Sequence, residues 1–341
     1  EFVISHTAWS DNDEWKEFYY ELIWTREGKE FRQWANGQMV DILDPEFVVN
    51  FDLEIDKAVT PGDVVPITVT YNNKGKYTIE SLEFQLNLVS SYWDIDKFIS
   101  EDNIFVQRLD GSAKLVWSYK NIPSLALIQP GENRSFELQV PTKNYISGSS
   151  GTGLLANIAY QYKVNNLDVK ISGLSSSVKL NSNLSISAYP MYYTATGDQL
   201  GRGPVPPTVG EETKYWIFAR MINDINDVEN VTVTAELPFN VSWNDRSSVP
   251  VGDPIVYNAA DRTLTWKISK IPVNPANIGF AFEVGIIPTA SQIEKYPLLL
   301  NNISVQGTDT STNNLITKDL GAITTQLNVD KKGKLRDGVV K

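Results

Sequence analysis

The chain contains no cysteine and only one histidine, His6. Without cysteine it cannot form disulfides, hold a zinc–thiolate site or carry out thiol chemistry. A single histidine excludes multi-histidine metal sites and histidine-based catalytic triads, unless His6 itself takes part. These absences exclude several classes of metal centre and of hydrolase.

The sequence also lacks any apolar run that approaches the length of a membrane span, and no signal peptide is visible. The chain begins at Glu1 rather than at methionine. We therefore expect a processed or truncated product whose signal or anchor lies outside these residues. Membrane association is expected only through such an anchor.

Positive charge is in short supply, with 30 Lys and Arg against 41 Asp and Glu and a net charge of −11. Nucleic-acid binding needs a basic surface that neutralises phosphates, so no nucleic-acid partner is expected. Binding to an anionic membrane surface is disfavoured for the same reason. Hydrophobic residues make up 42% of the chain, which is typical of a folded globular protein.

The most informative pattern that is present is an internal repeat. Leu115-Val116-Trp117 is followed by Asn121-Ile122-Pro123, and far downstream Leu264-Thr265-Trp266 is followed by Lys270-Ile271-Pro272. The Trp-to-Pro spacing is six in both copies (123 − 117 and 272 − 266). Further matches join Phe136–Val140 to Phe280–Val284, and Leu154–Ile158 to Leu299–Ile303. A repeat this long predicts one β-rich unit used twice, as in a stalk, spacer or binding array.

Each repeat shows the alternation of β-strands, as in Val65–Tyr71 and Leu82–Leu88, with Gly- and Pro-containing turns between the runs. Short strands at this spacing predict a β-sandwich. We expect an all-β chain with an extension at 1–45, a first module at 46–182 and a second at 183–328. The junction is placed at Asn181–Asn183, and the polar, basic tail at 329–341 is expected to fray or to lead into a further segment.

The N-terminal extension is unusually aromatic. Its aromatic residues are Trp9, Trp15, Phe18, Tyr19, Tyr20, Trp24, Phe31 and Trp34. One interpretation is an amphipathic helix that Ser10 caps and Gly28 ends. The alternative is a β-meander with Asn36-Gly37 as a tight turn. We predict a helix followed by a hairpin.

The run Tyr192–Pro204, which continues into Val209–Trp216, resembles a family of conserved surface proteins of candidate-phyla (Patescibacteria-type) bacteria, and Asn301–Asp309 fits the same pattern. More broadly, both modules are similar to DUF11-like and CARDB-like repeats, which are immunoglobulin-like domains. Their shared element is the strand that ends at Val69–Gly75. The resemblance covers roughly residues 46–327 and does not extend to the aromatic extension. It implies two tandem immunoglobulin-like β-sandwiches in an extracellular, envelope-associated protein, and it brings no catalytic residues.

Two acidic loops are candidate calcium sites, because calcium takes oxygen ligands from such loops. The first contains Asp94 and Asp96, and the second contains Asp224 and Asp227. Neither has the glycine and terminal glutamate of an EF-hand loop, so a solvated turn is the alternative. No other cofactor is expected.

The matched tryptophans, Trp117 and Trp266, are predicted to lie in the core between the sheets. The glycine-rich loop Gly197–Pro207 lacks the Lys-Ser/Thr of a phosphate-binding loop, so we expect it to brace the end of the second sandwich. No pair of carboxylates stands out for glycoside hydrolysis.

The candidate partner-binding residues are aromatic residues of the extension: Trp15, Tyr19, Tyr20, Trp24 and Trp34. They either pack on a module or on another subunit, or they stack on sugar rings. The leading hypothesis is therefore a non-catalytic cell-surface structural protein, a spacer or an assembly subunit of an envelope layer or filament. Its partners would be other subunits, reached by self-assembly. The alternative is an adhesin or glycan-binding module that uses the same aromatic residues.

Overall fold

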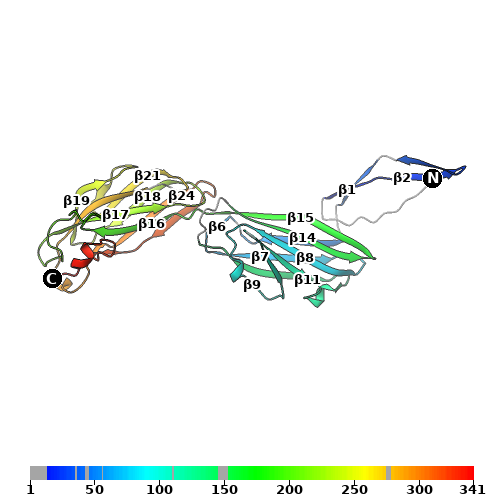
Figure 1. Ribbon diagram of the computed structural model, residues 1–341, viewed down its shortest axis with the longest axis horizontal. Helices are drawn as coiled ribbons and strands as arrows, with labels where there is room; N and C mark the ends of the chain where they lie inside the picture. Colours follow the sequence, from blue (N-terminus) through cyan, green and yellow to red (C-terminus); the bar gives the residue numbers. More distant parts are fainter. Residues whose placement is uncertain are drawn as a thin grey trace. The chain divides into compact units, whose positions relative to one another are not determined.

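The computed structural model describes residues 14–34, 37–42, 46–55, 57–109, 111–144, 153–273 and 278–341. Within these ranges the secondary structure consists of β-strands and short 3-10 helices, with no α-helix. The chain is therefore all-β, as predicted. It divides into two compact units, Glu1–Val178 and Lys179–Lys341 (Figure 1). The division falls four residues before the predicted boundary at 182/183 (182 − 178).

The first unit contains two antiparallel sheets. One has the order β5 (Phe47–Leu53), β7 (Val64–Asn73), β13 (Asn133–Pro141), β9 (Ile99–Ser100). The other has the order β10 (Phe105–Leu109), β11 (Ser112–Ser118), β8 (Ile79–Val89), β14 (Gly153–Val164), β15 (Leu167–Leu180), β6 (Ala58–Val59), and β12 (Leu127–Ile128) also pairs with β8. The sheets pack face to face, since Phe84 of β8 contacts both Tyr71 of β7 and Phe136 of β13.

The second unit repeats this arrangement. One sheet has the order β16 (Ser185–Met191), β17 (Thr213–Ile222), β22 (Gly279–Ile286), β19 (Val241–Ser248). The other has the order β20 (Val256–Asn258), β21 (Thr263–Ile271), β18 (Val228–Glu236), β24 (Asn302–Asp309), β25 (Leu315–Asp319). A short pair, β23 (Leu298–Leu300) and β26 (Ile323–Thr324), lies outside both sheets. The 3-10 helices of the two units are Ile95–Lys97, Pro123–Leu125, Ala290–Gln292 and Gly333–Arg336.

The two units share one strand order, so the sequence repeat is also a repeat of topology. In the first unit β11 pairs with β8, β8 with β14, and β7 with β13; in the second unit β21 pairs with β18, β18 with β24, and β17 with β22. Trp117 of β11 and Trp266 of β21 thus occupy equivalent positions, and both are buried. Trp117 packs on Phe136 and Trp266 on Phe280, which are matched residues as well. The prediction that both tryptophans belong to the core is confirmed.

The long strands form where apolar residues recur at every second position. In β7, Val65, Ile67, Val69 and Tyr71 are all buried, and the residues between them are partly exposed. Because successive strand side chains point to opposite faces, this alternation turns one face of the sheet toward the core. Each buried side chain of this size contributes roughly 1.5–3 kcal/mol to folding.

The predicted helix in the extension is wrong. Residues Glu14–Phe18 form β1, Glu21–Arg26 form β2, Lys29–Trp34 form β3 and Gln38–Ile42 form β4. Aromatic and β-branched residues such as Ile23, Trp24 and Thr25 favour strands over helix. The alternative meander is also not what forms, because β2 pairs with β3 while β1 pairs with β4. Residues 1–13, with His6, Trp9 and Ser10, lie outside the described residues.

The C-terminal tail, residues 329–341, packs on the second unit, so the expectation that it frays is wrong. Val340 is buried, Lys341 N donates to Pro207 O, and Lys341 O accepts from Val209 N. Asp330 is also buried, and Lys332 Nζ lies 4.3 Å from the centre of the Tyr193 ring. The tail is therefore anchored to the second unit by the buried side chains of Val340 and Asp330, although its sequence is basic and polar.

Two buried tyrosines, Tyr71 and Tyr215, are expected to make the protein less stable at alkaline pH. The hydroxyls of Tyr71 and Tyr215 have no hydrogen-bond partner in the described part of the chain. Burial raises the pKa of Tyr71 to about 12 and also raises the pKa of Tyr215. An unfolded tyrosine titrates near pH ~10, so the unfolded chain loses its proton first, and stability falls as the pH rises from about 10 to 12. In the variant Tyr71→Phe, we expect the alkaline loss of unfolding free energy that Tyr71 causes to disappear, and the unfolding free energy at pH 7 to stay nearly unchanged. Urea unfolding at pH 7 to 12 measures both. A wild-type pH profile in the variant would contradict this.

Candidate functional site

The strands β2 and β3 form a hairpin, which we call the aromatic hairpin (residues 21–34). Its two-residue turn is Glu27-Gly28, with φ angles of 53° and 72°. Positive φ at both turn positions is the type I′ geometry that matches the twist of a hairpin. Gly28, which the helical interpretation used as a helix end, is therefore the second turn residue.

One face of the aromatic hairpin carries a cluster of apolar side chains. Trp24 is directly opposite Phe31, and their rings stack with centroids 5.5 Å apart. Leu22 lies two residues before Trp24 and so points to the same face. These three side chains are 41–49% exposed. The face is therefore an exposed aromatic surface.

The opposite face combines ion pairs with further apolar side chains. Arg32 pairs with Glu30 at 2.8 Å and with Glu21 at 3.4 Å. Ile23 and Trp34 are on this face, and Trp34 is 67% exposed. A lone two-stranded hairpin is marginally stable in water, and this one exposes apolar groups on both faces. Such a surface is typical of a binding site for another molecule.

The remaining predicted partner-binding residues lie before the hairpin. Tyr19 is exposed, and its pKa is raised because its hydroxyl hydrogen-bonds to Glu17. Tyr20 is half-buried, and Trp15 is in β1, with its side chain outside the described part. The structure thus brings Trp24 together with Phe31, which the sequence did not single out, and keeps Trp34 on the other face.

A second candidate interface is the open edge of β13 in the first unit. Asn73 N donates to Glu132 O, which sets the alternation along β13. Ser135 and Glu137 then direct their backbone N–H and C=O groups away from β7. The neighbouring strand β9 pairs only with Leu138 and Gln139. A cavity of about 390 Å³ lies along this edge, lined by residues 99–102, 134–135 and 137–139.

The second unit fills the equivalent edge with its own chain. There β19 pairs with β22 from Val241 opposite Ile286 to Ser248 opposite Ala281. The same edge in the first unit is covered by Trp93, which bridges Thr142, by Asp94, whose N donates to Pro141 O, by two residues of β9, and by Asp102, which pairs with Arg134 at 2.6 Å. The fold therefore accepts a strand here, and in the described part of the first unit Ser135, just beyond the pairing with β9, has no strand partner on this side.

In both acidic loops, carboxylates pair with cations from the protein itself. Asp94 pairs with Lys97 at 2.8 Å, and Asp96 pairs with Arg108 at 2.9 Å. The structure does not bring a third carboxylate to them: the described residues contain no group of three or more metal-ligating side chains.

Asp224 and Asp227 have separate roles. Asp227 pairs with Lys270 at 2.7 Å and accepts a hydrogen bond from Val273 N, and both contacts hold its pKa below the usual range. Burial raises the pKa of Asp224. The calcium hypothesis thus gains no assembled ligand set from either loop.

The glycine-rich loop packs on β17. A Cβ at Gly203, where φ is 85°, would lie 2.1 Å from Glu212 O, and one at Gly201 would lie 2.4 Å from Lys214 O. Thr213 Oγ1 donates to Pro204 O in the same region. The loop braces the end of the sheet, as the sequence indicated.

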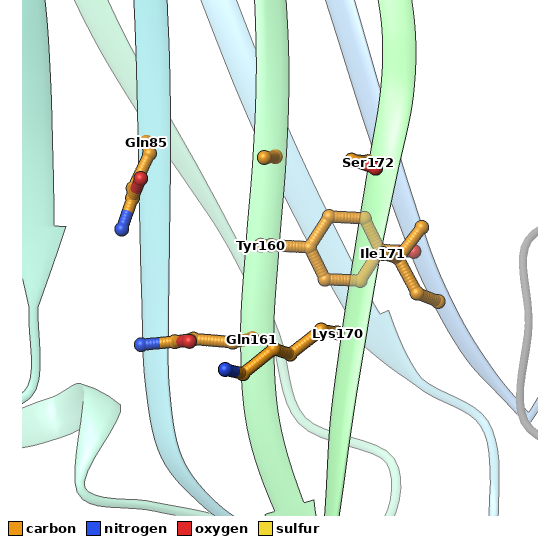
Figure 2. Close-up of a pocket in the computed structure, with 7 residues that line it drawn as sticks. Gln85, Tyr160, Gln161, Lys170, Ile171 and Ser172 are labelled. Atoms are coloured by element: carbon orange, nitrogen blue, oxygen red, sulfur yellow. The ribbon is translucent and has the colours of Figure 1, made fainter.

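Figure 2 shows a pocket of about 260 Å³ in the first unit, where Tyr160 projects from β14 toward β15 and lies beside Ile171. Its rim carries Gln85, Gln161, Lys170 and Ser172 (Figure 2). Gln85 and Gln161 both donate to Glu83, so their amides are committed to one carboxylate. The lining residues include no carboxylate or histidine, and this pocket offers no acid–base pair.

Sequence reasoning missed the most connected buried polar residues. Asn73 is the last residue of β7, and Asn223 follows the last residue of the matched strand β17. Asn73 Nδ2 donates to Ile128 O, and Asn223 Nδ2 donates to Ile271 O. Asp309 accepts from Ser182 N at 2.6 Å, which anchors the start of the second unit. Aligning the two copies beyond their tryptophans would have matched Asn73 with Asn223. Nothing in the sequence distinguishes Asp309 from a surface aspartate.

Comparisons with known proteins assign no family. No family model and no curated protein matches the chain. Among solved structures, the chain is similar to the C-terminal domain of the AgI/II polypeptide BspA of Streptococcus agalactiae, at 10% identity and a TM-score of 0.30, covering 79% of this chain and 95% of that one. It is also similar to a cohesin module from a family 33 glycoside hydrolase of Clostridium perfringens, at 14% identity and a TM-score of 0.27, covering 39% and 96%. A third likeness is to three N-terminal domains of the type V pili tip protein Mfa5 of Porphyromonas gingivalis, at 12% identity and a TM-score of 0.24, covering 32% and 23%.

Likenesses at these TM-scores identify neither the function nor the partners of this chain. Across the described ranges, none of the helices is long and apolar enough to span a membrane.

Proposed function

We propose that this protein is a non-catalytic structural subunit of a bacterial cell surface, built from two tandem immunoglobulin-like sandwiches and assembled through its aromatic hairpin. The observation that carries the proposal is the hairpin itself, with Leu22, Trp24 and Phe31 exposed on one face and Ile23 and Trp34 on the other. Burying such a surface against a second molecule is favourable by about 25 cal/mol per Å² of apolar area.

The partner in this proposal is a second copy of the chain. The open edge of β13 is the acceptor, because the N–H and C=O groups of Ser135 can pair with an added strand. In the second unit β19 pairs with β22 as far as Ala281, which corresponds to Glu137, so this edge of the fold takes a strand. An interface between unlike surfaces, a hairpin on one copy and an edge on the next, propagates into a filament or layer unless rotation closes it into a ring.

Replacing Trp24 and Phe31 together by serine tests the hairpin. We expect the full chain to show concentration-dependent assembly by light scattering and negative-stain imaging, and the double variant to remain monomeric. Deleting residues 1–45 should have the same effect and leave both units folded. The control is Phe239→Ser with Leu315→Ser, which removes two exposed apolar side chains of the second unit. Assembly that survives loss of the hairpin, or a wild-type chain that stays monomeric, would sink the proposal.

The acceptor edge has its own test. Ser135→Pro removes a backbone N–H that points away from β7, and proline is tolerated on an edge strand. We expect weaker assembly with an unchanged melting temperature. If Ser135→Pro assembles like the wild type, the hairpin docks elsewhere. A wild-type monomer whose tryptophan fluorescence responds to oligosaccharide would favour the glycan-binding alternative.

A further inference from the structure

The outer face of the four-stranded sheet in the second unit carries a row of residues that includes two aromatic side chains. Tyr189 of β16 is opposite Phe218 of β17, Phe218 is opposite Ala281 of β22, and Ala281 is opposite Ser248 of β19. The neighbours Ile217 and Ala219 are buried, so Phe218 points away from the core. The row therefore crosses all four strands on the side that faces solvent.

The two rings of this row lie side by side above a hollow. Their centroids are 6.2 Å apart, their planes are nearly parallel at 14°, and both side chains are half-buried. Next to them β22 offers only Gly279 and Ala281, which are too small to fill the space. A cavity of about 260 Å³ results, and Arg220, Ser248 and Pro250 complete its wall. We call this cavity the aromatic groove.

The first unit shows that the fold does not need these aromatic residues. Phe136 and Phe280 are matched in the repeat, so Glu137 corresponds to Ala281. Glu137 is opposite Thr68, and Thr68 is opposite Asp52. The row equivalent to Tyr189, Phe218 and Ala281 is thus Asp52, Thr68 and Glu137, an ordinary polar outer face. The same scaffold carries a hydrated surface in one copy and an aromatic groove in the other.

The polar groups around the groove limit what it can bind. Arg220 is exposed, and its guanidinium has no hydrogen-bond or ion-pair partner in the described part of the chain. Tyr189 and Ser248 add hydroxyl groups. In the adjacent row, Arg246 lies 5.9 Å from the Trp216 ring and pairs with the buried Glu283, which covers that aromatic face. Tyr189 and Phe218 are the aromatic residues of the outer row that line the cavity.

We propose that the aromatic groove binds a carbohydrate chain. A pyranose ring presents C–H bonds on its faces, which suit an aromatic surface, and hydroxyls around its edge, which suit Arg220, Tyr189 and Ser248. The shallow cavity has room for about one such ring, and the chain would continue along the open sheet face. The net charge of −11 argues against nucleic acid, the other polymer that stacks on aromatic rings. This site is separate from the aromatic hairpin and does not depend on assembly.

The test uses the full-length protein and affinity electrophoresis in gels that contain a neutral β-glucan, a mannan or polygalacturonate. We expect retardation by at least one polysaccharide, confirmed by calorimetry with its hexasaccharide. Tyr189→Ala with Phe218→Ala should weaken binding at least tenfold. The matched control, Asp52→Ala with Thr68→Ala in the first unit, should bind like the wild type. Arg220→Ala should weaken a uronate ligand more than a neutral one.

Several results would overturn this inference. Among them are no retardation by any of the three polysaccharides, and binding that the groove variant retains. A volume-conserving pair, Tyr189→Leu with Phe218→Leu, guards against misfolding and should also lose binding. If the groove variants abolish self-association and leave sugar binding intact, the groove is a protein-docking surface. The hairpin variant Trp24→Ser with Phe31→Ser should still bind sugar, so failure of either proposal can be distinguished.

Discussion

Asp330→Ala is expected to destabilise the second unit by about 3 kcal/mol or more, since it removes a charged acceptor of several buried hydrogen bonds. Oδ2 of Asp330 accepts from Tyr192 N at 2.8 Å and Tyr193 N at 2.7 Å, and Oδ1 accepts from Lys332 N at 3.1 Å and Gly333 N at 2.7 Å. The side chain is 1% exposed. One carboxylate therefore joins the chain after β16 to the C-terminal segment, and alanine would leave these N–H groups without an acceptor.

The measurement is urea unfolding followed by circular dichroism and by calorimetry. We expect the transition of the second unit to move to lower urea and that of the first unit to stay in place. Asp330→Asn keeps one carbonyl acceptor and should lie between wild type and alanine. Asp253→Ala, at an exposed aspartate of the same unit, is the control. A loss below about 1 kcal/mol would mean that these contacts form in the unfolded ensemble or are replaced by water.

Trp117→Ala and Trp266→Ala are expected to cost about 3–5 kcal/mol each, because each empties a large volume of a packed core. Trp117 packs on Phe136 with ring centroids 6.0 Å apart, and Trp266 packs on Phe280 at 4.6 Å. Each loss should fall on the unit that contains the tryptophan. The two variants therefore also assign the unfolding transitions to the two units.

Phenylalanine at the same positions separates packing from hydrogen bonding. Trp266 Nε1 donates to Val251 O at 3.2 Å, whereas Trp117 Nε1 has no partner within the described residues. Trp266→Phe should therefore destabilise its unit more than Trp117→Phe does, by roughly 1 kcal/mol. Equal losses at both positions would contradict this reading of the two indole groups. A single shared transition in all variants would show that the units do not unfold independently.

The candidate sites were only partly accessible from sequence. Aromatic residues in the extension pointed to a binding surface, yet the pairing of Trp24 with Phe31 needed the hairpin register, which the helical interpretation missed. The aromatic groove was missed entirely. Tyr189, Phe218 and Ala281 come from three different strands, β16, β17 and β22, and each is unremarkable alone. The open edge of β13 depends on β9 being short, which is a property of pairing rather than of composition.

The acidic residues show the same limit. Asp94, Asp96 and Asp227 looked like metal ligands because their neighbours in sequence are acidic. In space these carboxylates pair with Lys97, Arg108 and Lys270, contacts that the sequence did not reveal, and calcium binding stays a prediction. Asp330 lies in a basic tail that resembles a flexible end, yet it is buried.

The sequence by itself determined the β-strand content, the repeat and the core positions of Trp117 and Trp266, because alternation and spacing are local properties that every copy of the pattern repeats. Tertiary structure alone decided that the extension forms hairpins, that the tail docks through Asp330, and that Tyr189 and Phe218 share a face. The tail and the aromatic groove depend on partners distant in the chain, and the extension depends on the register of strand pairing. In each case burial or pairing outweighs local preference.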